Sequence, residues 1–291
     1  MMTLDLKSDQ PAAAVSPAPP VRAARPEPLG VPAEPAFPKD RTKALAVGLA
    51  IAMACAILGL WELAVTREWV STIVLPAPEE VAVAVYQGLV AGKVTWWGDI
   101  WTTLSETVMG FACGVTVALV LGALFAYVPV LRMAAYPFVV FLQTFPKIAI
   151  APVLVAWLGY GLLPKVVIGA LLAFFPVFAN TVAGLSQINS DEVRLMRSFG
   201  ATRWQELRFL RLPNALPYIF AAMDVAVVVS LLGVIVGEFV GSEQGLGYRI
   251  QARTGFGDMA SVYAVLFILG CIGTGLHQLM RLLKSLVIFQ E

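Results

Sequence analysis

Histidine, cysteine and charged residues are all scarce in this chain of 291 residues. It contains one histidine and three cysteines, and only 13% of its residues are charged. His277 has no second histidine with which to form a metal site or a catalytic pair, and Cys55, Cys113 and Cys271 lie in apolar runs without the spacing of metal ligands. The sequence therefore predicts no catalytic residue and no metal site. We expect the cysteines to be packing residues and His277 to be an interfacial side chain.

Hydrophobic residues, in contrast, make up 59% of the chain, and the mean hydropathy is +0.80. A soluble domain is about half apolar and about one quarter charged, so a water-soluble fold would not bury this much apolar surface. A run of about 20 apolar residues crosses the hydrocarbon core of a bilayer, and several such runs are present. We therefore predict an all-α integral membrane protein.

The first 43 residues differ from the rest because they are rich in proline and alanine and have few aromatic or β-branched residues. Such a composition does not build a packed core. The segment is too long and too polar to begin a secretory signal, and the apolar run after it is longer than the hydrophobic region of a signal. We predict a disordered cytoplasmic tail over residues 1–43 and a transmembrane domain over residues 44–291.

Six apolar runs predict six transmembrane helices, at about residues 44–66, 100–127, 134–158, 164–187, 214–240 and 259–280. We expect Pro146, Pro152 and Pro176 to interrupt the third and fourth spans, where the freed backbone groups would face protein or a water-filled cavity. Residues 78–92 begin too polar to span the membrane and predict a short helix outside it.

The orientation follows from the distribution of lysine and arginine in the short loops. With the N-terminus in the cytoplasm, the inner segments carry eleven basic residues: Lys39, Arg41, Lys43, Arg132, Arg194, Arg197, Arg203, Arg208, Arg211, Arg281 and Lys284. The outer segments carry five: Arg67, Lys93, Lys165, Arg249 and Arg253. The excess of basic residues predicts that both termini are cytoplasmic.

The longest inner loop, at about residues 186–213, has the signals of two short helices. Asn189 followed by Glu192 predicts one capping box, and Thr202 followed by Gln205 predicts a second. Gly200 lies between them, where a left-handed residue would end the first helix. The loop therefore predicts a knob of two helices joined at a glycine.

The second helix of this knob is expected to end at Leu212 and Pro213. Its apolar residues Trp204, Leu207 and Leu210 recur at a spacing of three residues. The basic residues Arg203, Arg208 and Arg211 lie between and beside them. A basic amphipathic surface of this kind suits either anionic lipid headgroups or a groove on a partner protein. The chemistry of the residues leaves both interpretations open.

The spacing in this loop resembles the cytoplasmic loop of binding-protein-dependent ABC importer permeases. That pattern is Glu-Ala-Ala, three residues, Gly, nine residues, Ile, one residue and Leu-Pro. Gly200, Leu210, Leu212 and Pro213 fall on this spacing, with leucine in place of isoleucine. The Glu-Ala-Ala triplet is missing, because residues 194–196 are Arg-Leu-Met. This departure puts in doubt any contact that the family makes through its acidic residue.

Three other segments resemble the nitrate, sulfonate and taurine branch of these permeases: FPKIAIAPVLVAWLGYG (145–161), GEFVGSEQGLGYRI (237–250) and LPAPEEV (75–81). The resemblance implies a type I ABC importer permease fold in the bacterial inner membrane. It implies a homodimer, two ATPase subunits docked on the cytoplasmic coupling loops, and a periplasmic substrate-binding protein. The residues that it assigns to ATPase docking are Arg194, Arg197, Gly200, Ala201, Thr202, Trp204, Leu207, Leu212 and Pro213.

No nucleotide-binding loop is found in the chain. The nearest approach, Gly88 to Val94, has the wrong spacing and lacks the serine or threonine that would reach magnesium. We therefore expect ATP and Mg²⁺ to be bound by a partner, no cofactor in this chain, no enzymatic activity of its own and no nucleic-acid partner.

Polar side chains within the spans mark a possible translocation path, because they are costly in lipid and face a bundle interior or a cavity. The residues of this kind are Gln143, Lys147, Asn180, Asp224 and Glu238, and all of them except Asp224 are expected along the translocation path. Lys147 is a counter-charge for an anionic substrate, a partner of Asp224 or Glu238, or a residue placed near a helix break. Glu238 is expected to cap or pair rather than to coordinate, and Asn180 to bond between helices.

These observations predict a permease subunit that forms the path for a small anionic solute, such as nitrate, a sulfonate, taurine or an aromatic acid. The alternative is a secondary transporter driven by an ion gradient, which fits the composition and the broken helices. No internal repeat relates the two halves of the chain, which disfavours that alternative.

Overall fold

The computed structural model of the chain describes residues 39–91 and 95–287, and within these ranges every regular element is a helix. The predicted tail, residues 1–43, lies outside the described part except for residues 39–43, which open the first helix. The chain divides into two units, Met1–Cys55 and Ala56–Glu291. The described part of the first unit is the beginning of helix α1 (Lys39–Thr66).

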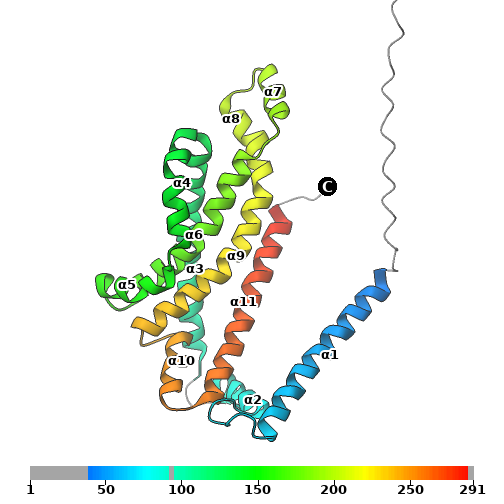
Figure 1. The fold of residues 1–291 in the computed structure, drawn as a ribbon, viewed down its shortest axis with the longest axis vertical. Helices are drawn as coiled ribbons and strands as arrows, with labels where there is room; N and C mark the ends of the chain where they lie inside the picture. The colour runs from blue at the N-terminus through cyan, green and yellow to red at the C-terminus, as the bar shows by residue number, and fades with distance from the viewer. Residues whose placement is uncertain (1–38, 92–94, 288–291) are drawn as a thin grey trace, which may run out of the picture. The chain divides into compact units, whose positions relative to one another are not determined.

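The second unit holds the rest of α1 and all later elements (Figure 1). In chain order these are α2 (Pro78–Tyr86), the π-helix η1 (Gln87–Ala91), α3 (Trp97–Tyr127), α4 (Pro129–Thr144), the 3₁₀ turn η2 (Lys147–Ile150), α5 (Ala151–Leu158), α6 (Leu162–Ser186), α7 (Ser190–Ser198), α8 (Arg203–Glu206), the π-helix η3 (Leu207–Arg211), α9 (Leu212–Gly241), α10 (Leu246–Gly255) and α11 (Met259–Val287).

Five helical stretches of the described chain are long and apolar enough to span a membrane, and one bent pair makes a sixth. The five are Ala44–Thr66, Trp97–Tyr127, Leu162–Ser186, Arg203–Gly241 and Met259–Val287. The pair, Pro137–Thr144 with Lys147–Leu158, is bent by 78°. The prediction of six spans is therefore confirmed, but the third span is sharply broken.

Proline has different effects at the predicted interruptions. The third span breaks at Phe145 and Pro146, where α4 ends and η2 begins, and Pro152 then lies in the first turn of α5. Pro176, in contrast, lies inside an uninterrupted α6. The Asn180 side-chain amide donates to the Pro176 carbonyl at 2.9 Å. The predicted break at Pro176 is thus wrong, and so is the expected helix-to-helix bond of Asn180, because this amide bonds within its own helix.

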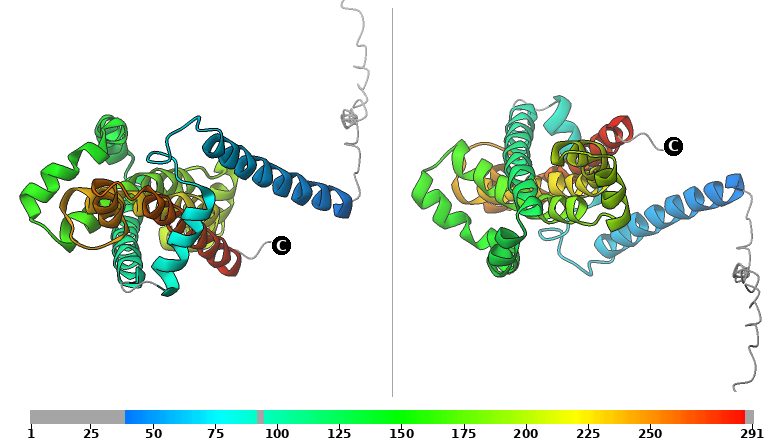
Figure 2. Two further views of the ribbon diagram at one scale, coloured as in Figure 1. Left: turned by 90° about the horizontal axis from the view of Figure 1, so that it is seen from below. Right: turned by 90° about the horizontal axis from the view of Figure 1, so that it is seen from above.

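The core of the second unit forms where α6 packs against both α3 and α9 (Figure 1, Figure 2). Ala118, Ala173 and Val177 are fully buried there. Glycine allows the close approach of the backbones, since a Cβ on Gly114 would lie 2.5 Å from the Ala170 carbonyl oxygen. Small residues at such positions are typical of helix packing in membranes.

The second helix of the loop does not end at Leu212 and Pro213, as predicted, but continues through η3 into α9. Residues Arg203–Gly241 form one helical stretch of 39 residues. Proline has no N–H and its ring collides with the carbonyl one turn earlier in an α-helix. The wide π-turn ahead of Pro213, in which the Leu212 N–H bonds to the Leu207 carbonyl, accommodates both effects.

This long stretch separates two regions of the molecule. Helices α7 and α8 lie at its N-terminal end, at the top of Figure 1, and α10 follows its C-terminal end, toward the bottom. The candidate sites described next lie at these two ends and at the broken span.

Candidate functional site

The loop between α6 and α9 is a knob whose ends are fixed by local hydrogen bonds. The Asn189 side chain accepts from the Asp191 N–H at 3.0 Å and caps α7, although Glu192 does not complete the predicted capping box. Gly200 has φ +75°, the left-handed conformation that was predicted. Thr202 and Gln205 form the second capping box, with the Thr202 N–H donating to Gln205 Oε1 at 2.7 Å.

Large apolar side chains of the knob are exposed on both sides of Gly200. Phe199 is 83% exposed, Trp204 66% and Phe209 65%. Leu207, which was expected on this surface, instead packs against the buried cluster of Leu185, Ala215 and Ile219. Phe199 and Phe209 were missed by the sequence analysis, because their positions follow from the turn at Gly200 and from the π-turn.

A network centred on Glu206 fastens the knob to the membrane helices. Glu206 is 6% exposed and accepts a hydrogen bond from Arg211 Nε at 2.8 Å. Arg197, on α7, approaches its other oxygen at 3.5 Å. Arg211 also donates to the carbonyl of Leu185 near the end of α6, at 2.9 Å. The carboxylate thus ties both arms of the knob to the end of a span.

The other docking residues predicted from the sequence lie around this network. Arg194 is strongly exposed and pairs with Asp191 at 3.5 Å. Ala201 is half-buried beside Gly200, and Leu212 is 42% exposed at the start of α9. Pro213 follows the π-turn η3 within the continuous helical stretch, and this turn accommodates its missing N–H.

Lys147 lies at the break of the third span. Its Nζ donates to the Gln143 carbonyl at 2.7 Å and stands 4.6 Å from the centre of the Phe175 ring. Within residues 39–91 and 95–287 no carboxylate pairs with it, so the alternative of an ion pair with Asp224 or Glu238 is wrong, whereas the alternative of a position near a helix break is confirmed. The break in the helix therefore places the Lys147 ammonium over an aromatic ring.

Asp224 instead contacts the single histidine. His277 Nδ1 lies 2.6 Å from Asp224 Oδ1, joining α9 to α11. The sequence analysis gave His277 no partner, and its predicted interfacial position is compatible with this contact because its side chain is 42% exposed. Because Asp224 and His277 lie far apart in the sequence, on different helices, their contact could not be predicted from the sequence alone.

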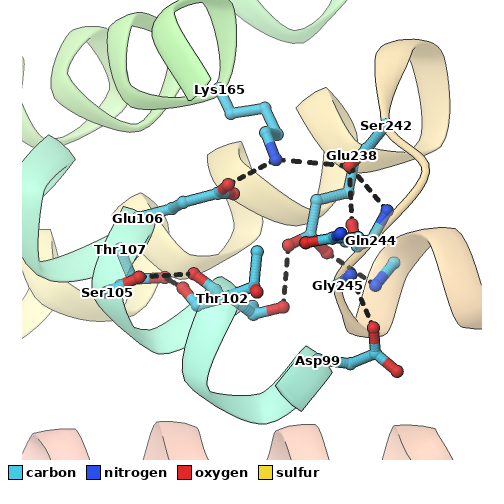
Figure 3. A network of polar contacts seen from close by, with 12 residues as sticks. Asp99, Thr102, Ser105, Glu106, Thr107, Lys165, Glu238, Ser242, Gln244 and Gly245 are labelled. Carbon is cyan, nitrogen blue, oxygen red and sulfur yellow. Dashed lines mark hydrogen bonds and ion pairs between the residues drawn. The ribbon is translucent and has the colours of Figure 1, made fainter. Parts of the chain in front are cut away.

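Glu238 is at the centre of a buried polar network at the other end of α9 (Figure 3). It is 0% exposed. Its Oε1 accepts from the Thr103 hydroxyl at 2.7 Å, and its Oε2 accepts from the Gly247 N–H at 2.6 Å. The Leu246 N–H donates to Thr103 Oγ1 at 2.9 Å. The carboxylate therefore caps the start of α10 and joins it to α3 and α9.

A second acidic residue of this network, Glu106, forms an ion pair with Lys165, and both side chains are buried. Lys165 also donates to Ser242 Oγ at 3.2 Å, which connects α6 to the turn after α9 (Figure 3). Glu106 Oε2 is buried without a hydrogen-bond partner among the described residues. A cleft of about 620 Å³ lies beside the pair, with Tyr160 and Gln244 in its lining.

Asp99 completes the network at the start of α3. It accepts from the Gly245 N–H at 2.9 Å and from Arg249 Nε at 2.6 Å. The backbone at Gly245 has φ +103°, and a Cβ there would lie 2.1 Å from Glu238 Oε1. Four helices, α3, α6, α9 and α10, are therefore locked together at this end by charged and polar side chains.

The described residues contain no group of three histidine, cysteine or acidic side chains placed to hold a metal ion. The features present are six apolar spans, a fastened knob with exposed aromatic side chains, and a cation at a broken helix. Together they define a polytopic helical membrane protein with an exposed two-helix knob at one end.

Comparison with known proteins gives the family. Residues 114–288 match the model of the binding-protein-dependent transport system inner membrane component, and the chain belongs to this family. The riboflavin transport system permease protein RibX of Chloroflexus aurantiacus is 33% identical over 246 residues, which cover 84% of this chain and 91% of RibX. SsuC of Bacillus subtilis, named as an aliphatic sulfonates transport permease protein, is 27% identical over 78% of this chain and 82% of SsuC.

The fold is also found in a solved structure. A chain of the MetNI methionine ABC transporter, in an inward-facing conformation, superposes with a TM-score of 0.58 at 22% identity. The match covers 65% of this chain and 94% of the other. The expected type I importer permease fold and the resemblance to the sulfonate and taurine branch are both confirmed.

Proposed function

The chain is a membrane-spanning permease subunit of an ABC importer, and we propose how it is assembled. Two copies form the translocation path, an ATPase subunit docks on the loop of each copy, and a periplasmic binding protein delivers the solute. In this assembly ATP and Mg²⁺ belong to the ATPase. The observation that carries the proposal is the knob itself: Phe199 and Trp204 are exposed on either side of Gly200, while Glu206 holds the base of the knob to the spans.

This docking role is favoured over lipid binding for the apolar tip of the knob. An interface needs exposed aromatic anchors on a preorganised base, which buried partners here provide. The remaining docking residues, Arg194, Arg197, Ala201 and Thr202, would surround these anchors as a polar rim.

The energy source distinguishes this proposal from an ion-driven transporter. We expect uptake into proteoliposomes only when the ATPase, ATP inside and the binding protein outside are all present. Ionophores that collapse every ion gradient should leave the rate unchanged. Uptake that follows an ion gradient without the ATPase would contradict the proposal.

We further propose that the solute is small and anionic, with nitrate, a sulfonate, taurine or an aromatic acid as the candidate class. Lys147 supports this, because it is a cation within a span with no carboxylate partner among the described residues. Gln143 and Asn180 remain in the proposed path, whereas Glu238 does not, because both of its oxygens are bonded in a fully buried site.

Replacing Lys147 tests this role. Lys147→Met should lower uptake at least about tenfold while the complex stays assembled, and Lys147→Arg should retain part of the activity, since it keeps the charge. Lys284→Met removes a lysine near the end of α11, outside the path, and serves as the matched control. Normal uptake by Lys147→Met, measured with radiolabelled solute at equal membrane levels, would remove Lys147 from the path.

A further inference from the structure

A cleft lined by arginine side chains lies where the knob meets the ends of the spans. Its volume is about 480 Å³. Four elements contribute one arginine each: Arg132 from α4, Arg197 from α7, Arg203 from α8 and Arg211 from η3. The one acidic residue in its lining is Glu206. Four guanidinium groups against one carboxylate leave a large positive excess.

Internal contacts neutralise only part of this charge. The Glu206 carboxylate forms ion pairs with Arg211 and Arg197, as described above. Arg132 reaches only a neutral group, the Ser186 hydroxyl, at 3.1 Å. Arg203 has no carboxylate partner in the described part of the chain. The guanidinium groups of Arg132 and Arg203 therefore have no acidic partner among the described residues.

The position of the cleft indicates which anion would reach it. Tyr127 and Ser186, in its lining, are the last residues of α3 and α6, so the cleft lies at the level where spans end. Val130 and Met133, on the same turns of α4 as Arg132, are 72% and 68% exposed. A basic pocket between span ends, flanked by apolar side chains, suits a phosphate group with hydrocarbon attached.

We propose that this cleft is a binding site for a phosphate-bearing anion, held by Arg132 and Arg203. Guanidinium groups bind phosphate oxygens in bidentate geometry, and more strongly than a neutral donor does. The phosphate would come from the headgroup of an anionic phospholipid or from a soluble phosphate. Arg132 and Arg203 are not among the proposed docking residues, whereas Arg197 belongs both to the proposed docking rim and to the lining of the cleft.

Lipid binding to the full-length chain tests the site. After delipidation in detergent, the chain is titrated with phosphatidylglycerol or with zwitterionic phosphatidylcholine, and bound lipid is counted by native mass spectrometry. We expect one phosphatidylglycerol to bind at least about tenfold more tightly to the wild type than to Arg132→Gln/Arg203→Gln, because two charged contacts are lost. Phosphatidylcholine should not distinguish the two proteins.

A second measurement separates the two sources of phosphate. In phosphatidylcholine nanodiscs, inorganic phosphate at constant ionic strength should raise the melting temperature of the wild type but not of the double variant if the ligand is soluble. No shift with phosphate, together with selective phosphatidylglycerol binding, would assign the site to lipid. A melting-temperature rise with phosphate would support a site for soluble phosphate, and selective phosphatidylglycerol binding without that rise would support a site for a lipid phosphate.

The control is Arg208→Gln/Arg281→Gln, which removes two arginines outside the cleft. Equal loss of lipid in this control would overturn the proposal, because general charge would then explain the binding. Unchanged lipid and phosphate binding in Arg132→Gln/Arg203→Gln would also overturn it. So would displacement of the bound lipid by the ATPase subunit, which would assign the cleft to the protein partner.

Discussion

At the scale of single residues, Gly200 sets the direction of the knob through its backbone rather than through packing. Its φ is +75°, and a Cβ built on it meets no atom within 4 Å. A larger side chain would therefore fit in space and still be strained in conformation. In L-residues with a β-branched side chain the left-handed region costs about 1–2 kcal/mol.

We accordingly expect Gly200→Val to reach the membrane at wild-type levels but to lose most of its uptake. The ATPase should fail to co-purify or should hydrolyse ATP without transport. Gly200→Asn is the informative control, since asparagine adopts the left-handed conformation more readily and should retain coupling. Uptake assays and co-purification at matched expression measure both outcomes. Full coupling in Gly200→Val would show that the angle at this residue is not mechanically important.

Residue features were predictable from the sequence where their partners are close along the chain. The Asn189 cap, the box of Thr202 with Gln205 and the turn at Gly200 depend on neighbours within a few residues. Glu238 and Thr103, in contrast, are 135 residues apart. A single sequence gives no indication of which distant helices pack together, so the acidic residue was located but its partners were not.

At the scale of elements, hydropathy predicted the spans but not how they connect. The third span bends by 78° at Pro146, as its proline indicated. The boundary at Pro213 was wrong, because the sequence does not show that a π-turn relieves the proline. Leu207 turned inward for the same reason, and Phe209 outward, since one wider turn changes which side chains share a face.

The attachment of the knob to the spans can be tested at Glu206. Glu206→Gln keeps the size of the side chain but leaves Arg197 and Arg211 without a carboxylate, and we expect a loss of about 2 kcal/mol in the stability of the loop. Limited proteolysis between residues 186 and 203 should become faster, and less transport should accompany each ATP hydrolysed. Glu192→Gln, an exposed acid on helix α7 of the same knob, is the matched control and should behave as wild type. Equal proteolysis rates in the two variants would contradict the fastening role.

At the scale of the whole molecule, the described spans separate a basic end from a locked end. The arginines of the loop gather at one end of α9, and the network of Glu106, Lys165 and Glu238 lies at the other. The proposed orientation places the basic end in the cytoplasm. The locked end would then face the binding protein.

Single cysteines test this orientation after Cys55, Cys113 and Cys271 have been replaced by alanine. A cysteine at Ser198, on the knob, should react with a membrane-impermeant maleimide only in inverted vesicles. A cysteine at Glu243, in the turn after α9, should react only in right-side-out vesicles or spheroplasts. The reverse pattern would place the loop outside and exclude docking of a cytoplasmic ATPase.

The unbroken run from Arg203 to Gly241 makes the knob and the locked end parts of one lever. At 1.5 Å per residue 39 residues extend about 58 Å, so a rigid-body tilt of about 5° would move the far end by about 5 Å. Glu238, near that far end, would be displaced relative to Thr103 by more than the length of its hydrogen bond. In the proposed importer, a displacement of the docking loop and the opening of the Glu238 network would therefore be coupled through one continuous helical stretch.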